Sequence, residues 1–317
     1  MLWEGDCWDC KMKILGLNFG KVNGNCKYFL EAALQAARVE HPEAEIEVVD
    51  TIKLKIGRCI GCGGCSRALE AGKPIACVVK DDYEELSDKV LDADAIIVAA
   101  PVYVLAPVGQ LKNFVDRFGP AHDMAYMMFE NELRRDNGGE LLHERNFKRH
   151  YVSYISVGGA TTDHWLSMGL AGMQLFGMSL NMKQVDMVNV TGAYIPPMRE
   201  KFAEDCRNLG MRTANAVGKA YKDIPWESDP GVCPACHCSI MMMNNTATVC
   251  CPVCGIHGTV SVADGGLKYE FSEEEIGRSR MNLAGVIEHQ AEIGRRDRYG
   301  DKYDEYVRKL SQIAAEK

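Results

Sequence analysis

The chain has 317 residues, which is enough for one core of about 200 residues and an accessory module. Its composition of 47% hydrophobic and 25% charged residues is that of a soluble globular protein. A formal charge of -8 argues against a nucleic acid as the main partner. The start of the chain is acidic, and its longest apolar run contains Pro101 and Pro107, which argues against a secretory signal and a membrane span. We therefore expect a cytoplasmic protein.

Strands and helices alternate along residues 12–225. Short apolar runs predict strands at 12–17, 44–50, 95–100, 150–155 and 184–190. Apolar residues at helical spacing predict helices at 25–40, from Asp82 onward, around 111–118, at 165–178 and at 200–222. Such alternation predicts an α/β fold with a doubly wound, five-stranded parallel sheet. Ligands of these folds bind beyond the carboxyl ends of the strands, so the loops after residues 17, 100 and 155 are the candidate site.

The first of these loops has the composition of a phosphate site. Its glycines allow close backbone approach, its Asn side chains donate hydrogen bonds, and the following helix contributes its positive end. The loop lacks dinucleotide and Walker spacings, which favours a monophosphate, although a Gly-Asn turn between strand and helix is also common. The candidate residues are Asn18, Gly20, Lys21, Asn23, Gly24, Asn25 and Cys26.

The second loop carries a longer motif. Pro101, Val102 and Tyr103 are followed by Gly109 to Lys112 and then by the pair Asp116 and Arg117. With this arrangement the sequence resembles the NADPH-dependent FMN reductase and iron-sulfur flavoprotein family over roughly residues 12–225. The resemblance implies a flavodoxin-like fold, bound FMN, and flavin sites near the interfaces of a homodimer or homotetramer.

The same resemblance implies which residues contact the flavin. In the family, the second loop lies against the isoalloxazine ring, which assigns Pro101, Val102, Tyr103 and Val104 to the cofactor. The third loop matches the turn at the other ring edge, with Ser156, Gly158 and Gly159. For Tyr103 an ordinary place in the core is the alternative. The first loop departs from the family pattern, because Cys26 replaces a threonine and a Ser-Pro pair is missing.

Fourteen cysteines are many for a reducing compartment, where disulfides are rare, and ten of them form tight groups typical of metal sites. Cys59, Cys62, Cys65 and Cys77 follow a Cys-x2-Cys-x2-Cys-x11-Cys pattern. Three thiolates at such short spacing, with a fourth farther along, predict a 4Fe-4S cluster. Zinc and a motif without a cluster are alternatives. Cys7 and Cys10 form a further pair, read as incidental thiols or as ligands shared between subunits.

A second set of four cysteines follows residue 225. Cys233, Cys236, Cys251 and Cys254 form two Cys-x2-Cys knuckles separated by 14 residues, the spacing of a structural zinc ribbon. A rubredoxin-like iron site and a haem attachment site are the alternatives. Cys238, Cys250 and His257 are spare potential ligands.

The predicted organisation has four parts. Residues 1–11 form an extension, 12–225 the FMN-binding domain, 226–270 the zinc ribbon and 271–317 a helical tail. Residues 120–149 are read either as a lid over the flavin or as an interface helix.

The expected function is that of an oxidoreductase. FMN would exchange electrons with NAD(P)H or a ferredoxin-type donor, the 4Fe-4S cluster and a small-molecule acceptor. The alternative is a non-catalytic electron carrier or a redox sensor that docks through the zinc ribbon. No catalytic acid or base is assigned.

Overall fold

The computed structural model of the chain describes residues 11–226, 232–244, 246–263 and 265–316. These residues form two compact units. The first unit contains the described residues up to Asp123 together with Leu142–Ile224, and the second contains Met124–Leu141 together with those from Pro225 onward. Within the part of the chain that the structure describes, no helix is long and apolar enough to cross a membrane.

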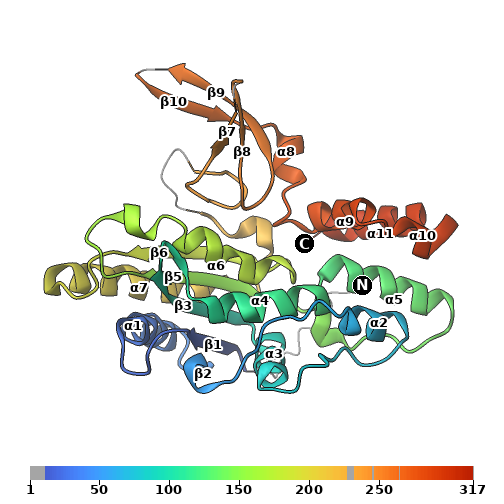
Figure 1. Cartoon of the computed structure of the whole chain (residues 1–317), viewed down its shortest axis with the longest axis horizontal. Coiled ribbons are helices and arrows are strands. Elements are labelled where there is room, and N and C mark those ends of the chain that lie inside the picture. Colours follow the sequence, from blue (N-terminus) through green and yellow to red (C-terminus); the bar gives the residue numbers. More distant parts are fainter. Residues whose placement is uncertain (1–10, 227–231, 245, 264, 317) are drawn as a thin grey trace. The chain divides into compact units, whose positions relative to one another are not determined.

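The first unit is built on a parallel sheet, which confirms the expected fold class (Figure 1). The parallel strands run in the order β2-β1-β3-β5-β6, and short β4 pairs antiparallel with the end of β3. The strands are β1 (Lys13–Asn18), β2 (Glu45–Asp50), β3 (Ala95–Tyr103), β4 (Ala106–Pro107), β5 (Tyr151–Val157) and β6 (Lys183–Val190).

The strands of this sheet are apolar because helices cover both of its faces. On β5, Tyr151 and Ile155 belong to the core under α1 and α7, the helices that pack together on one face. Val152 and Tyr154 alternate with them and meet α6, where Gly177 leaves room for the Tyr154 ring. The helices of this unit are α1 (Asn25–Glu40), α2 (Gly64–Glu70), α3 (Tyr83–Asp92), α4 (Gly109–Ala121), α6 (Gly169–Met178) and α7 (Pro196–Ala216).

Two helices differ in extent from the segments expected from the sequence. The segment 165–178 begins as the 3-10 turn η3 (Asp163–Leu166), and α6 starts only at Gly169. The segment 200–222 starts earlier, because two prolines occupy the first turn of α7. It also ends earlier, since Gly218 has a φ of 83° that no helix contains. The remaining 3-10 turns are η1 (Thr51–Lys53), η2 (Glu144–Phe147) and η4 (Tyr221–Asp223).

The second unit combines a small antiparallel sheet with helices. The sheet has the order β10-β9-β8-β7, with β7 (Met242–Met243), β8 (Thr248–Cys250), β9 (His257–Ala263) and β10 (Gly266–Glu270). The helices are α5 (Met124–Asp136), α8 (Glu273–Gly277), α9 (Leu283–Glu292), α10 (Arg296–Tyr299) and α11 (Tyr303–Glu316), with the 3-10 turn η5 (Gly300–Lys302).

Helix α5 packs against the C-terminal helices of this second unit. The carboxylate of Glu130 is buried and accepts hydrogen bonds from Arg298 and from the hydroxyl of Tyr299. Glu132, also buried, pairs with Lys309, and the ring of Phe129 contacts the ring of Tyr303. The segment read from the sequence as a lid or an interface helix therefore contributes a buried helix to the second unit.

Candidate functional site

The first loop joins β1 to α1, and Asn18 holds its shape. The Asn18 side chain is buried and accepts a hydrogen bond at 3.0 Å from the amide of Gly20. Its amide group donates to Asp50 at 2.9 Å and to the carbonyl of Lys21 at 3.3 Å. These hydrogen bonds occupy the side chain, so Asn18 supports the loop from below rather than facing a ligand.

The loop ends at the N-terminus of α1, a helix of 16 residues. Gly24 precedes the helix, no side chain caps it, and its first turn contains no acidic residue. The first amides of any helix lack acceptors within it, and the helix dipole adds positive potential there. The backbone at Asn25 is therefore suited to an anion such as a phosphate.

Cys26 lies beneath this loop. A Cβ atom at Gly20 would come within 2.8 Å of the Cys26 sulfur, so only glycine lets the loop fold down onto the thiol. Burial raises the pKa of Cys26 to about 12, which keeps the thiol protonated at neutral pH. Cys26 thus contributes packing beneath the loop and no charge.

The second loop is a tight hairpin between β3 and β4. Tyr103 pairs with Ala106, and the two residues between them, Val104 and Leu105, have φ angles of 50° and 72°. Positive φ at both positions is the type I′ turn, which normally contains Asn and Gly. The turn projects from the sheet with Val104 96% exposed, and the carbonyl of Leu105 accepts a hydrogen bond from the amide of Met168.

The third loop follows β5 and is buried at its start. A Cβ atom at Gly158 would lie 2.6 Å from the buried side chain of Leu166, so this position requires glycine. Gly159 is exposed, and a Cβ atom there would meet the ring of Tyr194, which is itself exposed. Ser156 is fully buried, and its hydroxyl has no hydrogen-bond partner among the described residues. It packs closely against α6, where a Cβ atom at Gly169 would clash with it.

These three loops lie together at the carboxyl ends of the parallel strands. They follow β1, β3 and β5, which are neighbours in the strand order, and parallel strands present their carboxyl ends together (Figure 1). Exposed aromatic side chains lie on or beside the second and third loops, at Tyr103, Trp165 and Tyr194. The N-terminus of α1 suits an anion, and the exposed aromatic rings suit a flat molecule. Together these features suit a ring compound that carries a phosphate. This fold and this site define the flavodoxin-like class.

Comparison with known proteins agrees with that class. Residues 12–162 match the NADPH-dependent FMN reductase family. The resemblance drawn from the sequence motifs is thereby confirmed.

Individual relatives extend the match. Flavone synthase cfoJ of Aspergillus candidus is 28% identical over 298 residues, which cover 89% of this chain and 88% of that protein. An iron-sulfur flavoprotein of Archaeoglobus fulgidus is 40% identical over 110 residues, 34% of this chain and 46% of that protein. The solved structure of a flavone reductase, 24% identical, has a TM-score of 0.75 and covers 96% of this chain and 97% of that one. The fold thus has a counterpart across both compact units.

The first set of four cysteines lies between η1 and α3, with Cys65 in the short helix α2 and the other three on the loops that flank it. Cys59 and Cys62 are exposed, and Cys65 and Cys77 are half-buried. Gly61 and Gly63 have φ angles of 65° and 63°, which fold the Cys-x2-Cys-x2-Cys segment into consecutive turns.

Gly64 brings the two arms of this loop together. A Cβ atom at Gly64 would lie 2.9 Å from a methyl group of Val78 and 3.5 Å from the sulfur of Cys62. The segment that carries Cys62 therefore packs against the returning segment just after Cys77. No three of the four sulfurs of this set, all of which the structure describes, lie within 4.8 Å of one another.

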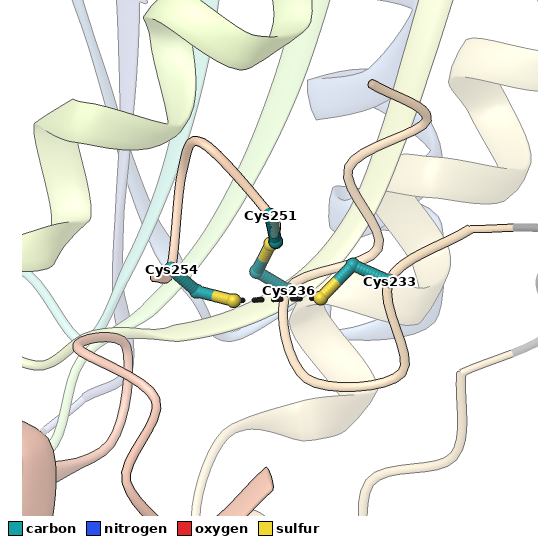
Figure 2. Close-up of side chains that lie close together, drawn as sticks. All are labelled: Cys233, Cys236, Cys251 and Cys254. Carbon is teal, nitrogen blue, oxygen red and sulfur yellow. Dashed lines mark hydrogen bonds between the residues drawn. The ribbon is translucent and has the colours of Figure 1, made fainter. Parts of the chain in front are cut away.

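The second set of four cysteines forms a compact, buried group in the second unit (Figure 2). Across the described residues, it is the only set of three or more His, Cys, Asp or Glu ligand atoms that lie within 4.8 Å of one another. The sulfurs of Cys233 and Cys254 are 3.4 Å apart, as are those of Cys236 and Cys251. A single ion with metal-sulfur bonds of about 2.3 Å would hold them about 3.8 Å apart, whereas a cubane cluster needs a wider frame.

The two knuckles have the same backbone geometry. The amide of His237 donates to the carbonyl of Cys233 at 2.8 Å, and the amide of Gly255 donates to the carbonyl of Cys251 at 2.9 Å. Both fifth residues have positive φ, 61° for His237 and 80° for Gly255. His237 adopts this angle without being glycine, and its ring stacks on Trp226 at 3.9 Å. The repeated turn presents two thiols from each knuckle to the same point.

The thiols of this group shift one another's pKa values. Hydrogen bonds with neighbouring sulfurs raise the pKa of Cys236 and lower that of Cys251, since the close thiols stabilise one thiolate among them. The spare candidates lie outside the group. Cys238 is buried and accepts a hydrogen bond from Ile240, while His257 lies 3.7 Å from Glu275. Cys7 and Cys10 lie outside the described residues.

The first set of four cysteines lies within residues 55–82, the first cysteine loop. The sequence motifs did not reveal which side chains fix this loop to the rest of the unit. Gln110 and Arg117 belong to the family motif on α4, yet their side chains hydrogen-bond the backbone of residues 51–57. Their spacing of seven residues places them on one face of the helix, and this shared face is the feature of the sequence that could have indicated a common role. No sequence pattern pointed to Asp81, the partner of Arg117.

Proposed function

We propose that the protein is an FMN-dependent oxidoreductase that takes electrons from NAD(P)H or a ferredoxin-type donor and delivers them to a small, flat acceptor. The observation that carries the proposal is the convergence of three loops at the carboxyl edge of β1, β3 and β5. Bound FMN would supply the exchange of one or two electrons at its ring. The chain would bind and orient that ring.

Each loop has a part in this binding. The amides at the start of α1, around Asn25, hold the FMN phosphate. The hairpin at Tyr103 and Val104 lies along the ring, and the turn that begins at Ser156 lies at the opposite edge. Gly158 and Gly159 let the backbone approach the ring without a side chain in between. Asn18, Gly20 and Cys26 shape the first loop.

The acceptor is proposed to be a planar aromatic compound. Exposed rings at Tyr103, Trp165 and Tyr194 provide stacking surfaces beside the proposed flavin position. A relative that matches nearly the whole chain is named a flavone synthase, which has a flavone as its product, and a solved structure of the same fold is named a flavone reductase, which reduces one. Flavones are flat conjugated ring compounds. We therefore place flavone-like enones first among the acceptors to be assayed.

Two metal centres complete the proposal. A 4Fe-4S cluster on Cys59, Cys62, Cys65 and Cys77 would exchange single electrons with the flavin, as the iron-sulfur flavoproteins among the relatives suggest by name. A zinc ion on Cys233, Cys236, Cys251 and Cys254 would stabilise the small sheet of the second unit.

The FMN site is tested by Asn25→Asp. An aspartate in the first turn of α1 favours the helix but repels a phosphate, so we expect FMN affinity to fall at least about tenfold. Riboflavin, which lacks the phosphate, should bind the variant and the wild type equally. Asn137→Asp, the same charge change at an exposed position, is the matched control. Equal FMN affinity of variant and wild type would contradict the assignment of the loop.

The reaction is tested with purified protein reconstituted anaerobically. Loss of the flavin absorbance on adding NADPH, followed by its return on adding a flavone, would support an oxidoreductase acting on this class. Reduction by reduced ferredoxin alone, with no turnover of any small acceptor, would favour the electron carrier instead. Iron, sulfide, zinc and FMN are measured on the same sample.

A further inference from the structure

The first cysteine loop is closed at its base by backbone and carboxylate contacts. The amide of Asp82 donates to the carbonyl of Lys55 at 3.0 Å, and the amide of Lys55 donates to the Asp82 carboxylate at 2.7 Å. The Asp81 carboxylate accepts hydrogen bonds from the amides of Gly57 and Tyr83, at 2.7 Å and 3.1 Å. The residues before Cys59 and after Cys77 therefore lie side by side.

Arg117 of α4 ties both arms of this base together. Its side chain is 1% exposed, and its guanidinium forms two hydrogen bonds to the Asp81 carboxylate, at 2.9 Å and 2.7 Å. It also donates to the carbonyl of Gly57 on one arm and to that of Val79 on the other, each at 3.2 Å. Nη1 contacts both oxygens of Asp81 and the Gly57 carbonyl, while Nη2 donates to the Val79 carbonyl. Two fixed nitrogens of one planar group therefore hold both arms, which the single ammonium of lysine cannot do.

The guanidinium also packs on an aromatic ring. It lies 4.1 Å from the centre of the Tyr83 ring. Burial raises the pKa of Asp81, but hydrogen bonds from Arg117 and from the amides of Gly57 and Tyr83 outweigh this and lower the pKa overall. Arg117 and Asp81 thus form an ion pair at the base of the loop.

Two further residues of α4 continue this contact. Asn113, one turn before Arg117, donates to the carbonyl of Ile56 at 3.1 Å. Gln110, one turn earlier again, donates to the carbonyls of Thr51 and Leu54, at 2.8 Å and 3.2 Å. The helix that follows the proposed flavin hairpin therefore holds the incoming arm of the cysteine loop along about two turns.

We propose that Arg117 is the positioning residue of the first cysteine loop. It fixes the two arms that carry Cys59 and Cys77, through Gly57 on one arm and Val79 and Asp81 on the other, and so holds the loop ready for a bound cluster. The role toward a cluster rests on the proposed function, whereas the anchoring of the loop does not.

The anchoring is tested without any cluster. In metal-free protein, Arg117→Gln should speed hydrogen exchange of amides in residues 55–82 by about tenfold or more, because it leaves the Asp81 carboxylate without its charged partner. Asp81→Asn should have a similar effect, and the double variant should add little to either change. Lys112→Gln, which removes an exposed charge from the same helix, is the control. Unchanged exchange in Arg117→Gln would overturn the proposal.

The role toward a cluster is tested in reconstituted protein. Arg117→Gln should incorporate less than about half the iron and sulfide of the control, because the two arms of the loop are no longer held together. Arg117→Lys keeps the charge but cannot hold both arms, so it should show a similar loss. Full iron and sulfide in Arg117→Gln would overturn this role. If the wild type takes up no sulfide, the proposed cluster fails, and hydrogen exchange still decides the anchoring.

Discussion

Two residues of the second loop have backbone angles that their side chains disfavour. Val104 is β-branched and has a φ of 50°, a conformation that costs non-glycine residues about 1–2 kcal/mol. Its side chain is almost fully exposed, so no packing in the chain itself compensates for this cost. Strain of this kind concentrates at ligand sites, which agrees with the proposed flavin contact.

Relief of this strain gives a first prediction. Val104→Asn should raise the free energy of unfolding by about 1 kcal/mol, because asparagine suits a type I′ turn and little burial is lost. Denaturant unfolding measures the change. Val39→Asn, at an exposed helical position with ordinary angles, should change stability by less than about 0.5 kcal/mol. A destabilised Val104→Asn would show that the side chain packs against something the turn requires.

A buried histidine gives a prediction on pH dependence. Burial, with a smaller contribution from Arg145, lowers the pKa of His122 from 6.5 to about 4. The unfolded chain therefore takes up this proton at a higher pH than the folded chain. The free energy of unfolding should fall by about 3 kcal/mol from this group alone as the pH drops from 7 to 4.

His122→Gln should remove that part of the pH dependence. Glutamine can keep the hydrogen bond that joins His122 to Ser87 at 3.2 Å, and it does not titrate. The stability curves of variant and wild type should converge as the pH falls from 7 to 4, as measured by urea unfolding. His164→Gln, at an exposed histidine, should leave the curve unchanged. Parallel curves for His122→Gln and wild type would mean that His122 titrates normally in the folded state.

At the scale of elements, the two cysteine sets differ in the way the backbone presents their sulfurs. The ribbon gathers its thiols by two equivalent knuckles whose turns are local, so the Cys-x2-Cys spacing was sufficient to predict the group. The first set relies on a loop whose arms are joined by α4. Its geometry therefore depends on contacts with residues such as Arg117, distant in sequence.

Metal removal from the ribbon gives the third prediction. Cys236→Ser should lose the tightly bound metal and bring about cooperative loss of hydrogen-exchange protection in β7 to β10, because a module this small depends on its metal. Cys250→Ser should keep one ion per chain, since Cys250 lies outside the buried group. Elemental analysis counts the metal and tells zinc from iron. Metal loss in both variants would contradict the assigned ligand set.

At the scale of the whole molecule, α5 is inserted between α4 and β5 of the first unit but belongs to the second. Its acidic side chains Glu130 and Glu132 are buried, and each has a basic partner near the end of the chain. Residues 124–141 and the C-terminal helices therefore form one helical layer assembled from distant segments.

The fourth prediction concerns this layer. Glu130→Gln should destabilise the second unit by about 2 kcal/mol, because Arg298 loses a charged hydrogen-bond acceptor. The change should appear as faster hydrogen exchange in α5 and α11, with exchange in the parallel sheet unaffected. Glu292→Gln, on an exposed pair with His289, is the matched control. If both variants exchange at the wild-type rate, Glu130 contributes no net stability.

The sequence by itself determined the parallel sheet, the family and the buried ribbon cysteines. Each depends on local signals: apolar strands alternating with amphipathic helices, the motif from Pro101 to Arg117, and knuckles of fixed spacing. Only the tertiary structure showed that Arg117 holds the cysteine loop, that Val104 is strained, and that α5 joins the C-terminal helices. The contacts of Arg117 and of α5 join residues far apart in the chain, and such contacts leave no periodic pattern in the sequence. The strain at Val104 arises locally, from the pairing of Tyr103 with Ala106, but its side chain gives no sign of the positive φ that this turn requires.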